Sequence, residues 1–188
     1  EKPSVSLVRQ IAKDMHEVKV KGGKIAVVAG PAIVHTGAAS SFAKMIRLGY
    51  VDALLSGNAL AVHDVEYALF GTSLGMNIEE GSTSLKGYRN HLVAINEIMK
   101  AGSLSEAVRK GVLKKGIMYE CIVNKVPFAL AGSIRDDGPL PDVITDMVEA
   151  QKRYKELLKD VKLVVMLAST LHSIAVGNLL PSTVRVVC

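Results

Sequence analysis

Short, continuous apolar runs separated by longer mixed stretches are the dominant pattern of this chain. Residues 24–29 form one such run, and residues 126–131 and 163–167 form two more. Runs of this length that are apolar at nearly every position, rather than at alternate positions, are typical of strands buried on both faces of a sheet. The pattern therefore predicts buried strands at these places.

The stretch from Val51 to Asp64 is the one around which the chain is organised. Its apolar first half predicts another strand, which breaks at Ser56-Gly57-Asn58, and a helical pattern then continues to Phe70. Asn58 is expected to be the N-cap of that helix, because its side-chain oxygen can accept an N–H of the first turn.

The remaining stretches are predicted from their periodicity and their punctuation. Gly49 and Gly102 stand where left-handed residues usually end a helix, and Ser103 with Glu106 has the spacing of a capping box. Helices are predicted over residues 38–48, 85–100, 113–124 and from about 142 to 158, with shorter ones opening at 103 and 169. Residues 30–37 and 132–139 are predicted to be loops, residues 71–83 to be irregular, and residues 184–188 to be a fifth strand.

Strands that alternate with helices, each strand nearly all apolar, predict a parallel sheet with helices on both faces. The fold class is thus α/β, with a Rossmann-like sheet over residues 24–188 and a polar, partly amphipathic lead-in over residues 1–23. The chain opens without methionine and ends inside a predicted strand. We therefore expect it to be a piece of a longer protein, truncated at its C-terminal end.

Composition narrows the class further. With 188 residues, 49% of them hydrophobic and 22% charged, the chain is long enough for one globular domain with an ample core. No signal peptide or membrane-spanning run is recognised, and the net charge of +5 comes from scattered residues without aromatics between them, so neither membrane nor nucleic-acid binding is expected. Cys121 and Cys188 lie far apart and without metal spacing, which predicts a reduced, cytoplasmic protein and no metal site.

Polar loops are predicted to gather at one edge of the sheet. Ligands of such sheets bind beyond the carboxyl ends of the strands, and four polar loops (30–37, 56–64, 133–138 and 168–172) belong to that edge. Their small residues allow backbone N–H groups to approach a pyrophosphate. Gly30 and Gly37 do not form the usual Gly-x-Gly-x-x-Gly fingerprint, however, and no acidic residue ends the second strand to hold a ribose. The pattern alone favours a cofactor-binding domain over an α/β domain of unknown ligand.

The candidate residues also have structural interpretations. His35 could cap a helix or bond a neighbouring loop, and His63 could be partly buried with a backbone partner. Asp64 could be an acid favoured by the helix dipole. His16 and His91 are interpreted as surface histidines. The convergence of four polar loops on one edge favours the functional interpretation.

Five longer motifs add a resemblance. They are Ala-Gly-Pro-Ala-Ile-Val-His-Thr-Gly (29–37), Leu-Leu-Ser-Gly-Asn-Ala-Leu-Ala-Val-His-Asp (54–64), Ala-Leu-Phe-Gly-Thr-Ser-Leu-Gly (68–75), Ala-Gly-Ser-Ile-Arg-Asp-Asp-Gly-Pro-Leu-Pro-Asp (131–142) and Leu-His-Ser-Ile-Ala-Val-Gly-Asn-Leu-Leu-Pro-Ser (171–182). In this order they resemble the archaeal-type ornithine cyclodeaminase family, which is also labelled by a lysine-oxoglutarate reductase/saccharopine dehydrogenase-related domain. The same region is similar to the C-terminal part of cyanobacterial arginine dihydrolase/ornithine cyclodeaminases.

The resemblance implies a fold like the NAD-binding fold of deoxyhypusine synthase, with NAD as the cofactor. It also implies a redox-neutral reaction that converts L-ornithine to L-proline and ammonia, in which a hydride passes from Cα to NAD and later returns. Two alternatives stay open: an oxidoreductase domain of the saccharopine dehydrogenase type, and a module that binds NAD or an amino acid without turnover. The expected partner is this small-molecule substrate, and the protein is expected to be a homo-oligomer.

The resemblance implies that Asn58, Ala59, Asp137 and residues 169–172 contact NAD, and the other site residues are assigned from the polar loops and from side-chain chemistry. Arg135 is expected to bind the substrate carboxylate with its planar fork, Asp64 or Asp136 to receive an ammonium, and His63 to shuttle a proton. The predicted cofactor-binding residues are Gly30, His35, Thr36, Gly37, Asn58, Ala59, Asp137, Ser169, Thr170, Leu171 and His172.

Overall fold

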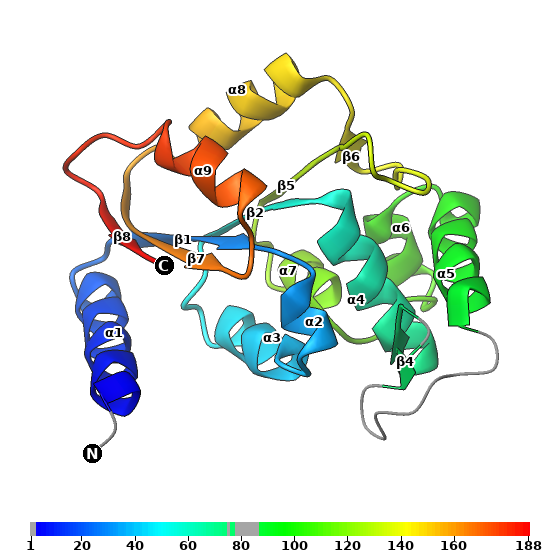
Figure 1. Ribbon diagram of the computed structural model, residues 1–188, viewed down its shortest axis with the longest axis horizontal. Coiled ribbons are helices and arrows are strands. Elements are labelled where there is room, and N and C mark those ends of the chain that lie inside the picture. Colours follow the sequence, from blue (N-terminus) through cyan, green and yellow to red (C-terminus); the bar gives the residue numbers. More distant parts are fainter. Residues whose placement is uncertain (1–2, 75, 78–86) are drawn as a thin grey trace.

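The protein folds around a six-stranded parallel sheet with the strand order β6-β5-β2-β1-β7-β8 (Figure 1). The computed structural model describes residues 3–74, 76–77 and 87–188. The strands of this sheet are β1 (Lys24–Ala29), β2 (Ala53–Gly57), β5 (Phe128–Ala131), β6 (Val143–Ile144), β7 (Val161–Leu167) and β8 (Arg185–Val187). The predicted parallel sheet is confirmed.

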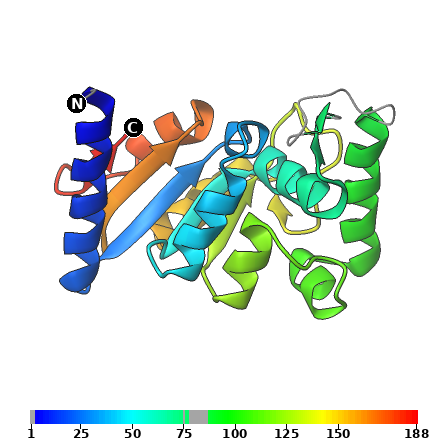
Figure 2. The same cartoon turned by 90° about the horizontal axis from the view of Figure 1, so that it is seen from below.

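Helices cover both faces of the sheet, as Figure 2 shows from below. They are α1 (Pro3–Val20), α2 (Ala32–His35), α3 (Ala39–Arg47), α4 (Asn58–Phe70), α5 (Gly87–Ala101), α6 (Leu104–Arg109), α7 (Ile117–Val123), α8 (Met147–Leu157) and α9 (Leu171–Gly177). A separate antiparallel hairpin, β3 (Thr72–Ser73) and β4 (Met76–Asn77), follows α4. Among the described helices, none is long and apolar enough to cross a membrane.

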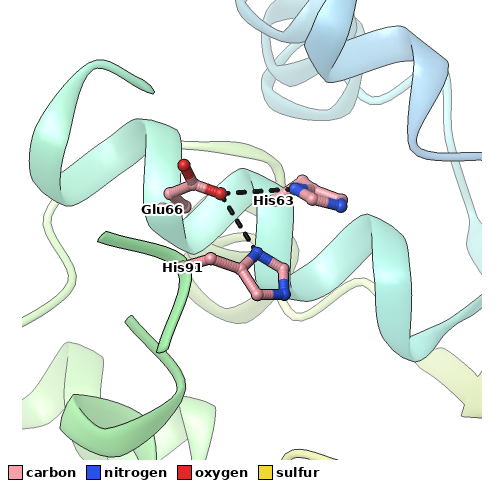
Figure 3. A group of neighbouring side chains, drawn as sticks. All are labelled: His63, Glu66 and His91. Carbon is pink, nitrogen blue, oxygen red and sulfur yellow. Dashed lines mark hydrogen bonds and ion pairs between the residues drawn. The ribbon is translucent and has the colours of Figure 1, made fainter. Parts of the chain in front are cut away.

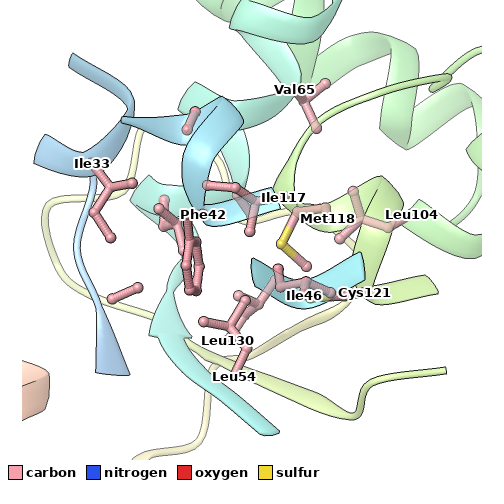
Figure 4. Packing of buried hydrophobic residues seen from close by; sticks show 14 of the residues in the cluster. Ile33, Phe42, Ile46, Leu54, Val65, Leu104, Ile117, Met118, Cys121 and Leu130 are labelled. Atoms are coloured by element: carbon pink, nitrogen blue, oxygen red, sulfur yellow. The ribbon is translucent and has the colours of Figure 1, made fainter. Parts of the chain in front are cut away.

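Alternate side chains of each strand enter two different cores, because successive residues of a strand face opposite sides. Ile25 and Val27 lie in the larger core with residues from α1 to α7, whereas Ala26 and Val28 lie in the smaller core under α8 and α9. Figure 4 shows part of the larger core, where Phe42 packs near the strand residue Leu54. Burial on both faces is why the strands are apolar throughout.

Several predicted boundaries were right for the predicted reason. Gly49 and Gly102 both have positive φ, of +78° and +99°, just after α3 and α5. The Ser103 hydroxyl accepts the Glu106 N–H at 3.0 Å and so caps α6. Helix α5 is also confirmed from residue 87 onward, although its predicted beginning at residues 85–86 lies outside the described residues. Residues 75 and 78–83 of the predicted irregular stretch lie outside them too, and the described part of that stretch forms the β3–β4 hairpin instead.

Other boundaries were wrong because distant contacts decide them. The predicted loop after β1 contains the short helix α2, which Pro31 begins with its fixed φ of −64°. The helix predicted from 142 begins only at Met147, since Val143 and Ile144 pair with β5 and Asp146 then caps α8. The predicted helix from 113 to 124 shortens to α7, which begins after Gly116 at φ +108°.

Candidate functional site

A cavity of about 520 Å³ lies at the carboxyl ends of β1, β2, β5 and β7. Loops from all four strands line it, as the position of polar loops in the sequence predicted. The sequence-predicted residues on its wall are His35, Asn58, Ala59, His63, Arg135, Asp136, Asp137, Ser169, Thr170, Leu171 and His172. Gly30, Thr36, Gly37 and Asp64 are not part of the wall.

Glycines at the ends of β1 and β2 allow the cavity loops to meet closely. A Cβ on Gly30 would lie 1.9 Å from the carbonyl oxygen of Ala168, so the β1 and β7 loops can touch only without a side chain there. A Cβ on Gly57 would lie 2.7 Å from the imidazole of His172. Ser169 Oγ lies 3.2 Å from Nδ1 of the same ring. Burial lowers the pKa of His172, although the negative charge of Asp136 acts to raise it. The His172 ring is therefore held against the end of β2.

The predicted N-cap role of Asn58 is wrong, because Gly57 occupies the N-cap position with extended backbone and Asn58 is the first residue of α4. The Asn58 side chain is 3% exposed and faces the loop after β5 instead. Its Nδ2 donates to the Gly138 carbonyl at 3.3 Å, and its Oδ1 accepts the Leu140 N–H at 3.0 Å. Asn58 thus ties the start of α4 to the loop that carries Arg135.

The beginning of α4 presents backbone donors to the cavity. No side chain caps this helix, and Gly57, Asn58 and Ala59 all line the cavity wall. The unpaired N–H groups of a first helical turn, together with the helix dipole, favour an anionic group at that place. The β2-to-α4 turn is therefore suited to a phosphate or pyrophosphate.

Asp64 lies outside the cavity, in the core between α4 and α7, which contradicts its expected position beside a bound substrate. Its two carboxylate oxygens accept the N–H groups of Ile117 and Met118, each at 2.8 Å. Burial raises the pKa of Asp64 to about 6, although these two bonds act to lower it. Asp64 caps the first turn of α7, so we do not include it among the groups that meet substrate.

Thr36 and Gly37, which were predicted to contact the cofactor, have structural roles at the end of α2. The Thr36 hydroxyl donates to the Ala32 carbonyl at 2.8 Å and so closes the last turn of α2. Gly37 has a left-handed backbone, with φ of +78°, directly after it. Both residues shape the α2 end, while His35 from the same helix reaches the cavity.

A cluster of histidines surrounds a buried carboxylate on one side of the cavity (Figure 3). Oε2 of Glu66 lies 3.4 Å from Nδ1 of His63 and 3.1 Å from Nδ1 of His91. The His63 ring also contacts the rings of His35 and His91, with centroids 4.6 Å and 4.8 Å apart. Nδ1 of His35 lies 2.7 Å from Ser73 Oγ. Burial lowers the pKa of His35, and the neighbouring imidazole of His63 lowers it further.

Two members of this cluster differ from the sequence analysis. His91 was interpreted as a surface residue but is only 6% exposed, because α5 packs against α4. Glu66 was missed altogether, although it is fully buried. The signal that points to it is its position three residues after His63, which puts both side chains on one face of α4.

The loop from Ser133 to Gly138 contributes Ser133, Arg135, Asp136 and Asp137 to the cavity wall. It is held by its own residues, since Asp136 Oδ2 accepts the Ser133 N–H at 2.8 Å and Ser133 Oγ accepts the Arg135 N–H at 3.2 Å. Within the described chain, the Arg135 guanidinium makes no ion pair with Asp136, so the structure does not support an internal salt bridge as the purely structural explanation of this arginine. Asp137 faces the histidine cluster, with its Oδ2 3.7 Å from Nε2 of His91.

The chain matches a family model described as arginine dihydrolase ArgZ-like, C-terminal, Rossmann fold, over residues 9–188. It is 57% identical to an ornithine cyclodeaminase of Methanothermobacter thermautotrophicus over 188 residues, which cover all of this chain and 46% of that relative. The chain thus spans about half the length of the curated relatives that it matches.

Solved structures give the same result. A conserved LOR/SDH protein of Methanococcus maripaludis S2 superposes with a TM-score of 0.96 at 53% identity, over all of this chain and 57% of that one. The ternary complex of AgrE with ornithine and NAD+ superposes with a TM-score of 0.96 at 46% identity, over all of this chain and 28% of that one. A deoxyhypusine synthase of Entamoeba histolytica shares only the fold, with a TM-score of 0.52 at 10% identity over 77% of this chain and 57% of that one.

Proposed function

Because this chain belongs to the family of arginine dihydrolase ArgZ-like C-terminal Rossmann-fold domains, we propose that it is the NAD-binding part of an ornithine cyclodeaminase. The AgrE structure with ornithine and NAD+ supports this proposal. The observation that carries it in this chain is the cavity at the ends of four parallel strands, with the uncapped start of α4 on its wall. A cytoplasmic location and a homo-oligomeric state stay predictions.

The residues present fit a dinucleotide. In this proposal the pyrophosphate lies at the β2-to-α4 turn, where Gly57 and Ala59 leave room for close backbone approach. The start of α9, from Ser169 to His172, and Asp137 supply further polar contacts from the facing loops. When bound there, NAD would supply an acceptor for the hydride of the substrate Cα and a donor for its return.

The loop residues Arg135 and Asp136 on the cavity wall fit an amino acid with a second amino group. Arg135 would bind the α-carboxylate through two parallel N–H···O bonds, which a guanidinium allows and an ammonium does not. Asp136, beside it, would receive an ammonium of ornithine. His63 would take a proton from the substrate, since imidazole exchanges protons near neutral pH.

A stoichiometric assay of the full-length protein tests the function. We expect ammonia and proline to form from ornithine in equal amounts, with NAD required and no net NADH accumulating. Net NADH production would instead identify an oxidoreductase of the saccharopine dehydrogenase type. NAD binding by titration calorimetry without any turnover would identify a binding module.

The Arg135→Lys variant tests the substrate side of the cavity. A bidentate contact is lost, so KM for ornithine should rise more than about tenfold, equivalent to about 1.4 kcal/mol, while NAD affinity is unchanged. The matched control is Arg153→Lys, since Arg153 lies in α8 and pairs there with Glu156 at 3.0 Å. A wild-type KM in the Arg135 variant would remove this residue from the substrate site.

A further inference from the structure

We propose that Glu66 is a positioning residue of this site, which fixes the protons of His63 and His91 on Nδ1 so that Nε2 of each ring is a proton acceptor. This inference rests on the proposed function and adds Glu66 and His91 to it. It starts from the juxtaposition of the three side chains in Figure 3, where both imidazoles turn Nδ1 toward one carboxylate oxygen.

The other donors around Glu66 show why the carboxylate must accept rather than donate. The Thr72 hydroxyl donates to Oε1 at 3.0 Å, and the Leu74 N–H donates to Oε2 at 3.3 Å. Donors on both oxygens favour the ionised, acceptor-only form of the carboxylate. The hydrogen bonds at His63 and His91 then require the proton on Nδ1 of each ring, which leaves a lone pair on Nε2. At His91 this Nε2 lies 3.7 Å from Asp137 Oδ2, beyond hydrogen-bond distance.

Burial makes this arrangement rigid. Glu66 is fully buried and both histidines are less than a tenth exposed. A buried carboxylate is costly unless donors surround it, so rotation of either imidazole away from Glu66 is unfavourable. The donors come from α4, α5 and the segment after α4, which means that the tertiary fold, rather than one helix, sets the orientation of the two rings.

Two proton acceptors match the chemistry of the proposed substrate. Ornithine carries an α-ammonium and a side-chain ammonium, and each must lose a proton before its nitrogen can act as an electron-pair donor. An Nε2 atom can take one proton from each group, forming two N–H bonds and breaking two others. One proton returns to the leaving ammonia and the other to the ring nitrogen of proline, so that the sum of ornithine to proline and ammonium is balanced in atoms and charge.

A metal ion is the competing explanation, because the ligand atoms of His63, Glu66 and His91 all lie within 4.8 Å of one another. A metal would need both Nδ1 atoms without their protons. It would also share Oε2 with the Leu74 N–H, which already donates to that oxygen. The hydrogen-bonded arrangement satisfies all these atoms without an ion, and it is therefore the one we propose.

The ring protons can be observed directly. In the full-length protein labelled with ¹⁵N-histidine, two-bond ¹H–¹⁵N spectra at a pH where the rings are neutral should show the Nδ1–H form for His63 and His91. Spectra of His63→Gln and His91→Gln assign the signals. His16 is the internal reference, because its ring lies at an exposed site where Nδ1 faces the Tyr50 hydroxyl at 3.3 Å rather than a carboxylate. Nε2–H forms at His63 and His91 would overturn the proposal.

Kinetics give the second test. Glu66→Gln should lower kcat at least about tenfold, since proton-transfer groups contribute at least this much, while NAD affinity holds. Glu66→Asp, which keeps the charge, should recover part of kcat. The matched control is Glu120→Gln, because Glu120 is also buried but pairs with Arg47 and Asn124 away from the cavity.

The outcomes separate the two proposals. If wild-type protein turns over ornithine and a folded Glu66→Gln variant does so equally well, Glu66 has no positioning role and the function stands. If wild-type protein has no turnover, the proposed function fails, and the ring spectra still decide the proton positions. Stoichiometric divalent metal in the purified protein, with turnover lost on chelation and restored by that metal, would overturn the proposal in favour of a metal site.

Discussion

Helix α4 carries two fully buried carboxylates, Asp64 and Glu66, whose surroundings differ completely. Residues two positions apart point to different sides of a helix. Asp64 faces α7 and accepts two backbone N–H groups there. Glu66 faces the cavity side and contacts two imidazoles, a hydroxyl and one backbone N–H.

The difference shows that burial of an acid does not by itself indicate function. Backbone donors at the start of a helix have one protonation state, so a carboxylate that binds them can only hold the helix in place. Imidazoles can gain and lose protons, so a carboxylate that binds them influences chemistry at the cavity. The hydrogen-bond partner of each carboxylate, rather than the carboxylate itself, therefore distinguishes the structural side of α4 from the candidate catalytic side.

Asp64→Ala should produce the largest effect on the structural side. It leaves two buried N–H groups of α7 without an acceptor, so we expect the free energy of unfolding to fall by about 2–4 kcal/mol. Chemical denaturation of the full-length protein measures this loss. Asp64→Asn keeps one acceptor and should cost less. If the folded Asp64 variants lost NAD affinity, the separation of the two sides of α4 would be wrong.

The sequence predicted the sheet and the place of the cavity for general reasons. Apolar runs identify strands that are buried on both faces, and parallel strands must bring their following loops to one edge. The sequence could not show which side of α4 faces that edge. Asp64 was therefore expected to meet substrate, and Glu66 was overlooked.

The cluster could not be predicted because its contacts are distant in sequence. His91 lies 25 residues from Glu66, and only the packing of α5 on α4 brings them together. For the same reason, the local sequence could not predict where α8 begins. Its true beginning depends on the pairing of Val143 and Ile144 with β5.

The pH dependence of stability gives a smaller effect on the same side. Because the pKa of Asp64 is raised from 3.8 to about 6 in the folded protein, the folded state binds more protons between these values. Its contribution to stability is present below pH 3.8 and is lost as the pH rises through about 6, which amounts to about 2 kcal/mol between pH 4 and pH 7.

Asp64→Asn removes this titration. The free energy of unfolding of the variant, measured by denaturation at each pH, should therefore decline less than that of the wild type as the pH rises from 4 to 7. Other carboxyl groups titrate equally in both proteins and cancel in the difference. Parallel profiles for the two proteins would mean that the pKa of Asp64 in the folded protein is the ordinary one, and that burial between α4 and α7 does not raise it.

The smallest effect on turnover is expected from a substitution of Cys121, which lies in α7, the helix that Asp64 contacts. Burial, with the charges of Asp64 and Glu120 next, raises the pKa of its thiol, and a thiol that stays protonated is a poor nucleophile. Cys121→Ala should therefore leave ornithine turnover within about twofold of wild type, below about 0.4 kcal/mol in barrier. The buried Cys121 thiol should resist an alkylating reagent in the native protein and react after unfolding. A large loss of turnover in a folded Cys121→Ala variant would mean that the side of α4 facing α7 takes part in catalysis after all.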